Sequence, residues 1–187
     1  PVLLGCSITL DQETGWVDPI LNDDDWDITI LKLNRDGHWW DFALRLLQRG
    51  AQESPGRCVP SVGAFGGTGD TLAALRGTER LLVDIAIDPS RVRQAELCLM
   101  DIWIDVFETY YQIIQRAGEG SSSWFPLWSP GRFYPTQNDF SYMISPQMFV
   151  DVFLPALERQ LQHLDHSVYH VDGIGAFRHV PAPVSYT

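Results

Sequence analysis

The stretch CVPSVGAF-GGTGD-TLAAL, at residues 58–75, contains three successive patterns. Its first eight residues are mainly apolar, as in a buried strand. The next five suit a tight turn because three of them are glycine, and residues 71–75 suit a short helix. A strand that enters a helix through a glycine-rich turn is the beginning of a βα unit, so this stretch predicts an α/β fold.

Strand and helix patterns alternate along the rest of the chain as well. Three further segments have the composition of strands, namely residues 27–33, 121–129 and 166–172. Three segments have apolar residues at helical spacing, namely residues 39–48, 89–118 and 146–161. The last two begin with a capping residue followed by proline, at Asp88-Pro89 and Ser145-Pro146. Pro155 lies inside the last helix and predicts a kink there.

The alternation predicts a single α/β domain, built as a partial (β/α)8 TIM-type barrel with parallel strands and long flanking helices. Residues 1–57 form an N-terminal extension in this interpretation, and residues 58–187 hold the βα units. A closed barrel needs about 250 residues, more than the 187 of this chain. We expect the strands to follow the chain order with right-handed helical crossovers. An open half-barrel leaves apolar surface and a sheet edge bare, so we also expect a homo-oligomer.

The composition argues against several classes of function. A net charge of −11 at pH 7, without any cluster of Lys and Arg, is unsuited to nucleic acid. No apolar run reaches the roughly 18 residues of a membrane helix, and the chain begins with no basic, apolar leader. Cys6, Cys58 and Cys98 are odd in number and widely spaced, which indicates neither a disulfide framework nor a zinc knuckle. We therefore expect a cytoplasmic protein whose cysteines are small buried apolar residues.

Three stretches carry a resemblance to a known family: GGTGDTLAALRG at residues 66–77, DFSYMISP at 139–146 and YHVDG at 169–173. In order and spacing they resemble the uroporphyrinogen decarboxylase superfamily, over most of the chain from about Trp26 to about His179. This superfamily also contains zinc methyltransferases that serve corrinoid proteins. The resemblance implies a (β/α) barrel and an enzyme of small-molecule decarboxylation or methyl transfer. For methyl transfer it also implies zinc or another divalent metal, and a corrinoid protein as partner.

The chain departs from this family's pattern in three places. The first barrel strand, where the decarboxylases keep substrate-binding arginines and an aspartate, has no counterpart in the chain. Leu75 stands where those enzymes have a tyrosine, and Pro181 and Pro183 interrupt the pattern after His179. These differences weigh against the tetrapyrrole decarboxylation that those enzymes perform.

His170 and Asp172 are the main candidates for catalysis. Residues two apart on a strand project from one face, so both share a face with Val168. They lie at the carboxyl end of their strand, where barrel enzymes place catalytic groups. Because the related methyltransferases have a His-x-Cys pair of zinc ligands in this region, the resemblance implies that His170 and Asp172 bind Zn²⁺ or a harder divalent metal. No third ligand is evident, and His170 could equally hydrogen-bond Asp172 or a backbone carbonyl, so we expect weak metal binding or none.

Five other residues are candidates for the site. Asp139 precedes a capped helix and is either a turn former or a catalytic acid or base. Asp70 either caps the helix after the glycine turn or lines a pocket mouth that binds substrate. Trp124, Trp128 and Tyr142 could form the apolar wall of a substrate pocket, although aromatic residues are more often part of the core. The glycine turn could also bind an anion, but it lacks the full P-loop and dinucleotide patterns.

These observations favour an enzyme that performs metal-assisted methyl transfer, or a related reaction, on a small-molecule substrate. One alternative is cofactor-free decarboxylation of a tetrapyrrole carboxylate. The other is an incomplete barrel that is inactive by itself and serves as a binding module. Analysis of bound metal in the purified protein separates the first hypothesis from the other two.

Overall fold

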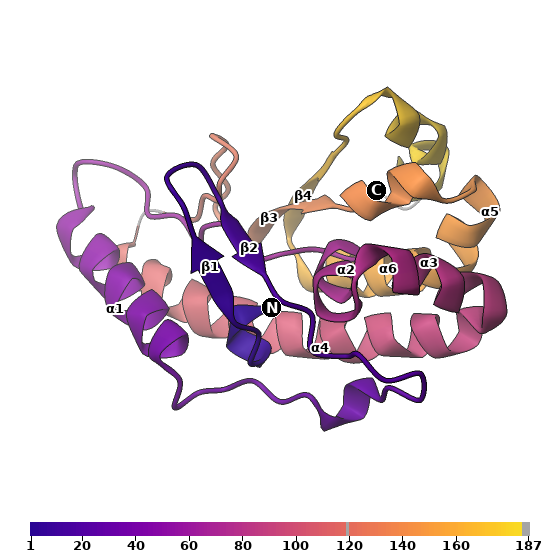
Figure 1. Cartoon of the computed structure of the whole chain (residues 1–187). Coiled ribbons are helices and arrows are strands. Elements are labelled where there is room, and N and C mark those ends of the chain that lie inside the picture. Colours follow the sequence, from indigo (N-terminus) through magenta and orange to yellow (C-terminus); the bar gives the residue numbers. More distant parts are fainter. Residues whose placement is uncertain (119, 185–187) are drawn as a thin grey trace.

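The structure combines helices with two small sheets (Figure 1). The computed structural model describes residues 1–118 and 120–184. The strands are β1 (Ile8–Leu10) and β2 (Gly15–Val17), which pair antiparallel, and β3 (Phe133–Gln137) and β4 (His166–His170), which pair parallel. The prediction of a partial (β/α)8 barrel with parallel strands is wrong. Within the described residues each sheet has two strands, and one of the two sheets is antiparallel.

The first segment expected to be a strand, residues 27–33, contains a short 3-10 helix instead, η2 (Ile28–Ile30). The Asp27 carboxylate accepts a hydrogen bond from Thr29 N at 2.8 Å and so begins a turn. A side chain that bonds to the backbone two residues later competes with strand pairing. Burial in the core, where Ile28 lies, therefore explains the β-branched residues of this segment, and strand pairing does not.

The next two expected strands, residues 58–65 and 121–129, are irregular segments that meet without forming a ladder. Isolated bridges join Ser61 to Ser122 and Ser121 to Ser129. Pro60 cannot donate a ladder hydrogen bond, and Gly63 has a φ of +74°, so the first segment cannot continue as a regular strand. The second segment folds back on itself, because Ser121 and Ser129 exchange backbone hydrogen bonds of 2.8 and 3.0 Å.

The sequence pattern does not indicate β3. Pro135 lies at its centre, and a proline in a strand usually argues against the assignment. In the described structure β3 pairs only with β4, with Phe133 opposite His166 and Gln137 opposite His170. A strand that is paired on one side tolerates a residue without an N–H, and β3 is stabilised by burial of all but its last residue.

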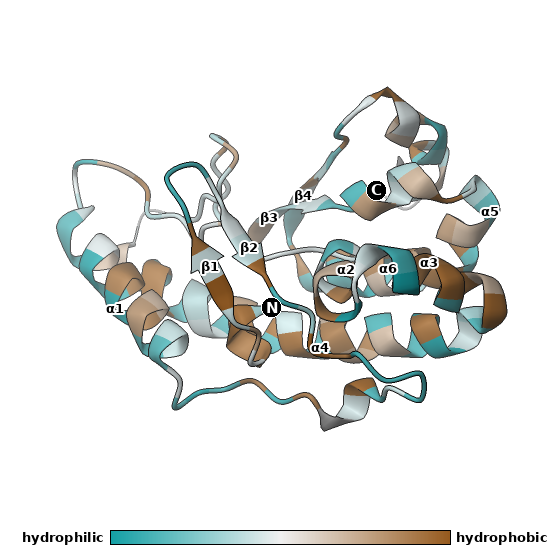
Figure 2. Cartoon of the chain, viewed as in Figure 1, coloured by the Kyte–Doolittle hydropathy of each residue, from teal (hydrophilic) through white to brown (hydrophobic). Residues whose placement is uncertain are grey.

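The longest helix, α4 (Pro89–Ile114), confirms the clearest sequence pattern. The Asp88 carboxylate accepts a hydrogen bond from Arg91 N at 3.1 Å, and Pro89 occupies the first helical position. This is the helix start that the sequence pattern predicts. Proline suits the first helical position because the N–H that it lacks would have no partner within the helix. In Figure 1 α4 runs along most of the molecule, and Figure 2 shows apolar and polar residues alternating along it.

Further helices are η1 (Val2–Leu4), α1 (His38–Glu53), α2 (Asp70–Arg76), α3 (Thr78–Ile87), η3 (Gln115–Ala117), η4 (Asp139–Met143), α5 (Pro146–Met148), α6 (Leu154–His163), η6 (Ile174–His179) and α7 (Pro181–Val184). Helices α1, α2, α3 and α6 are among those that contact α4. Helix α1 continues to Glu53, beyond residue 48 where the helical pattern of the sequence ends. No helix in the described part of the chain is both long enough and apolar enough to cross a membrane.

The kink expected at Pro155 takes the form of a π-helical turn, η5 (Phe149–Phe153), between α5 and α6. Leu154 N bonds to Phe149 O, five residues back. Pro155 has no N–H for the usual bond four residues back, and a π-turn is one of the ways in which a helix absorbs such a break.

Two hydrophobic clusters share α4 as their common wall. One contains Leu72, Leu81, Val92, Phe149 and Phe153, and it includes Leu21 and Trp26 from the N-terminal extension. The other is largely aromatic and contains Trp40, Trp103, Phe107, Tyr110 and Tyr134. Trp103 stacks on Phe107 with ring centroids 5.1 Å apart, and Phe65 stacks on Trp103 at 5.3 Å. Such contacts add to the free energy gained from apolar burial.

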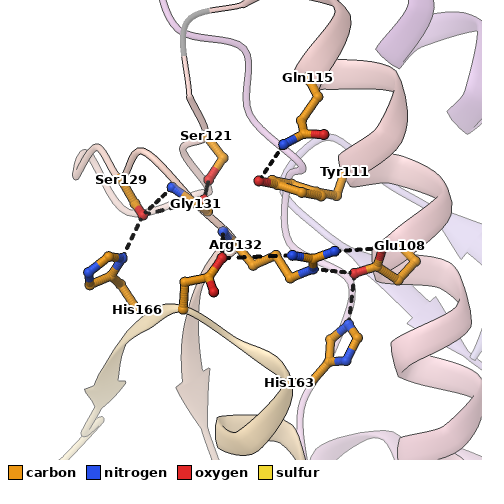
Figure 3. Close-up of polar contacts among 10 residues, drawn as sticks. Glu108, Tyr111, Gln115, Ser121, Ser129, Gly131, Arg132, His163 and His166 are labelled. Atoms are coloured by element: carbon orange, nitrogen blue, oxygen red, sulfur yellow. Dashed lines mark hydrogen bonds and ion pairs between the residues drawn. The ribbon is translucent and has the colours of Figure 1, made fainter.

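A polar network joins α4 to the amino ends of β3 and β4 (Figure 3). The Glu108 carboxylate accepts hydrogen bonds from Arg132 Nε at 2.7 Å and from His163 Nε2 at 2.8 Å. Arg132 N donates to Asp165 at 2.8 Å, and the Arg132 guanidinium lies 5.1 Å from the ring centroid of Tyr111. Partial burial acts to raise the pKa of Glu108, but the bonds from Arg132 and His163 outweigh it and lower the pKa.

We expect Glu108→Gln to lower the free energy of unfolding by about 1–2 kcal/mol at pH 7, because it weakens charge-assisted hydrogen bonds. Since folding lowers the pKa of Glu108, its contribution is present above its ordinary pKa of 4.5 and is lost as the pH falls through the folded value. Urea unfolding at several pH values should show the wild type and the variant converging in acid. Asp101→Asn, which removes an exposed ion pair with Arg159, is the control and should have a smaller effect.

Candidate functional site

The parallel pairing of β3 and β4 brings their carboxyl ends to one edge of the sheet. Gln137 and His170, the last residues of the two strands, lie opposite each other in the register. Asp139 follows Gln137 by two residues, and Asp172 follows His170 by two. The helical segment from α5 to α6 connects the strands, so this edge belongs to one βαβ unit.

The glycine turn at residues 66–69 packs against the same edge. Thr68 Oγ1 donates to Gln137 O at 3.3 Å. A Cβ at Gly67 would lie 2.8 Å from Gln137 O, and one at Gly69 would lie 2.6 Å from Asn138 Oδ1. The glycines therefore allow the close approach of the turn to the strand end, which is the structural role considered for them above. Gly69 N is bonded to Glu96 Oε1 at 3.1 Å, so it is not free to bind an anion.

Asp70 does not cap the helix that it begins. Gly69 is the N-cap residue of α2, and no side chain caps this helix. The Asp70 carboxylate instead accepts hydrogen bonds from Phe140 N at 2.8 Å and from Gln137 Nε2 at 3.2 Å. Burial raises the pKa of Asp70, while these two bonds oppose the rise. The Asp70 carboxyl group thus connects the glycine turn, by hydrogen bonds, to the end of β3 and the segment after it.

Gln137 links two carboxyl groups. Its Nε2 donates to Asp70 and also lies 3.3 Å from Asp139 Oδ2. Burial raises the pKa of Asp139, the charges of Asp70 and Asp172 raise it further, and His170 acts to lower it. Asp139, His170 and Asp172 are therefore close enough to influence one another electrostatically. A carboxyl group that keeps its proton to a higher pH is better suited to proton transfer near neutrality.

An open cleft of about 670 Å³ lies beside Asp70, Gln137 and Asp139, whereas His170 and Asp172 are not among the described residues that line it. Asp70, Gln137 and Asp139 form its polar side, while Ala73, Phe140 and Met143 are among its apolar residues. Polar groups that converge on a partly apolar cleft are typical of small-molecule sites.

The three aromatic residues expected to form a pocket wall do not line this cleft. Trp124 packs edge-on against the His170 ring, with centroids 5.1 Å apart and an interplanar angle of 85°. Trp128 is 60% exposed. Tyr142 is also exposed, and its ring lies so close to Gly175 that a Cβ there would clash with it. Trp124 therefore touches a candidate catalytic residue.

The two expected metal ligands lie at the same edge without a third. His170 Nδ1 is buried and has no hydrogen-bond partner among the described residues, whereas Asp172 is exposed. In residues 1–118 and 120–184, no group of three or more His, Cys, Asp or Glu side chains is arranged to hold one metal ion.

Two residues of this region were not identified from the sequence. Gln137 could not be found because β3 was not recognised. Glu96 is 2% exposed, and both of its carboxylate oxygens lie 3.1 Å from Gly69 N. The pKa of Glu96 is raised to about 8, mainly by burial and to a smaller extent by the negative charge of Asp70. The sequence carries a signal for Glu96, because it lies four residues after Val92 and three before Leu99, on the apolar face of α4.

The site as a whole is acidic, with carboxyl groups at Asp70, Asp139 and Asp172, and one imidazole at His170. Two of these carboxyl groups have raised pKa values and share the Gln137 amide. Such an arrangement can donate and accept protons and can bind groups that carry N–H or O–H donors. Comparisons of the chain with protein-family models, with curated proteins and with solved structures found no match.

Proposed function

We propose that the carboxyl edge of β3 and β4 binds a small neutral or cationic molecule and transfers a proton to or from one of its carbon atoms. The observation that carries this proposal is the linkage of Asp70, Gln137 and Asp139 beside His170, at an open cleft. Perturbed carboxyl groups in a cleft are more common at functional sites than elsewhere.

Asp139 is the acid or base in this proposal. Its carboxyl group lines the cleft, and its raised pKa keeps it partly protonated at a higher pH than an ordinary aspartate. Gln137 is a positioning residue, because its amide holds Asp70 and Asp139 in fixed places. His170 supplies a positive charge when protonated, which stabilises the ionised form of Asp139 after proton transfer.

The reaction classes consistent with this chemistry include the replacement of a carboxyl group by a proton, which the family resemblance also implies. Metal-assisted methyl transfer receives less support from these residues. The expected ligands, His170 and Asp172, have no third partner of the right kind, because among the described residues no group of three or more His, Cys, Asp or Glu side chains is arranged to hold one metal ion. The carboxyl groups of the site would repel a substrate that carries several negative charges. The site therefore does not suit a tetrapyrrole with many carboxylates.

Asp139→Asn is expected to reduce the activity by about 10²- to 10⁴-fold, the usual contribution of general acid–base catalysis. The protein is incubated in D₂O with a panel of small carbon acids, amino acids and pyrroles, and deuterium incorporation into carbon is followed by NMR. If Asp139 acts in its protonated form, incorporation should fall as the pH rises through its pKa, which is raised from 3.8.

Asp151→Asn is the matched control, because Asp151 is exposed and bonded to Gln147 within the neighbouring helical segment. It should leave incorporation unchanged. The proposal fails if the wild type exchanges no compound of the panel, or if Asp139→Asn retains full activity on a compound that the wild type exchanges.

A further inference from the structure

A second and larger cavity, of about 750 Å³, lies between α1 and the irregular segment at residues 58–66. Trp39, Phe42 and Leu46 line it from α1, and Val59, Val62 and Phe65 line it from the segment opposite. Residues 58–66 form no regular strand on this side of the cavity. Its volume is within the range of about 300–1,000 Å³ that is common for small-molecule sites.

The lining of this cavity differs in charge from the rest of the chain. Charged residues make up 20% of the sequence, yet none of the described side chains that line the cavity is that of Asp, Glu, Lys, Arg or His. Pro1 also lines the cavity, and burial lowers the pKa of its amino group, which favours the neutral form. A charged ligand would lose its hydration here without gaining a counter-charge, so the lining favours a neutral occupant.

The polar side chains in the cavity are few and neutral. Burial alone raises the pKa of the Tyr110 phenol to about 12, so it keeps its proton at neutral pH. The Tyr110 ring is fixed by contacts with Trp40 and Phe65, with centroid distances of 5.9 and 5.3 Å. A fixed phenol in an apolar cavity is suited to orient a ligand through one hydrogen bond.

The open side of the cavity exposes apolar surface. Phe42 and Leu46 are 46% and 63% exposed, although both line the cavity. Cys58 also lines it and is exposed. The expectation that every cysteine is buried is therefore wrong for Cys58, which follows the turn at residues 55–57. A ligand in the cavity would cover part of this surface, which favours binding.

We infer that the cavity between α1 and residues 58–66 is a binding site for a neutral, mainly apolar small molecule with a ring system and one hydrogen-bond acceptor for Tyr110. Its concave shape, its aromatic and aliphatic lining and its lack of charged side chains among the described residues together define this class of ligand. The inference does not depend on the proton-transfer site, which uses other residues at the edge of β3 and β4.

The test uses Nile red, a neutral ring compound with a carbonyl acceptor whose fluorescence increases in apolar surroundings. The wild type should bind it saturably at a 1:1 ratio and should retain a constant mass in size-exclusion chromatography. Ala43→Phe fills the cavity from α1 and should weaken binding at least 10-fold. Ala86→Phe, on the exposed side of α3, is the matched control and should bind like the wild type. Circular dichroism melts establish that both variants fold.

A second measurement uses the wild type alone. Bound Nile red should slow the alkylation of Cys58 by iodoacetamide at least several-fold, read by mass spectrometry of the peptide that contains it. Three results overturn the inference: non-saturable dye binding, equal binding by folded Ala43→Phe and Ala86→Phe, or an unchanged rate of Cys58 alkylation. It is also overturned if the wild type dimerises and Ala43→Phe is a monomer, because a second copy then covers the cavity.

Discussion

Glu96→Gln is expected to raise the free energy of unfolding by roughly 3 kcal/mol at pH 7. Burial raises the pKa of Glu96 to about 8 in the folded protein, from an ordinary value of 4.5. Between these two values the unfolded chain releases the proton that the folded protein keeps, so stability falls as the pH rises. The loss amounts to about 1.4 kcal/mol for each pH unit and is complete above the folded value. Glutamine is never ionised, and its carbonyl can still accept the hydrogen bond from Gly69 N.

The measurement is urea unfolding of the wild type and the variant at intervals between pH 4 and pH 9. The two should be similar in acid and should diverge as the pH rises, with the variant the more stable. Glu79→Gln changes an exposed glutamate on α3 and should alter stability by no more than about 0.5 kcal/mol. Parallel pH profiles for Glu96→Gln and the wild type would show that Glu96 is ionised at neutral pH in the folded protein.

The helices could be predicted from the sequence where their signals are local. Asp88-Pro89 and Ser145-Pro146 start helices in the structure as they do in the sequence pattern. A cap bonds to the backbone within three residues, so it acts before any tertiary contact forms. The strands depend on partners far away in the chain, and β3 is stabilised as a strand by pairing with β4 in spite of Pro135. Residues 58–65 have a strand-like composition, but no neighbour among the described residues pairs along their length.

The site could be predicted only in part, for the same reason. His170 lies at the end of a strand whose pattern is evident, so its position at a sheet edge follows from the sequence. The link from Gln137 to Asp70 and Asp139 depends on β3 and on the packing of the glycine turn against it, which no local pattern encodes. Trp128 and Tyr142 were grouped by residue type alone, and the structure leaves both exposed.

The N-terminal extension is attached to the core by a buried arginine. Arg76 is 3% exposed, and its guanidinium donates to Asp84 Oδ2 at 2.7 Å, to Leu21 O at 2.8 Å and to Asp23 O at 2.9 Å. Trp26 Nε1 donates to the same Asp84 oxygen at 3.1 Å. These bonds join α2, α3 and the loop before η2. A buried charge of this kind is tolerated only with its partners in place.

We therefore expect Arg76→Met to lower the free energy of unfolding by about 3–5 kcal/mol, because it leaves Asp84 charged without its partner. Arg80→Met is the matched control, since Arg80 makes an exposed hydrogen bond to Asn22 in the same loop, and it should cost at most about 1 kcal/mol. Urea unfolding at pH 7 measures both. In the double variant Arg76→Met/Asp84→Leu the unpaired carboxylate is gone, so part of the lost stability should return. If the double variant is no more stable than Arg76→Met, the loss comes from the backbone carbonyls of the loop, and the ion pair is not what attaches the extension to the core.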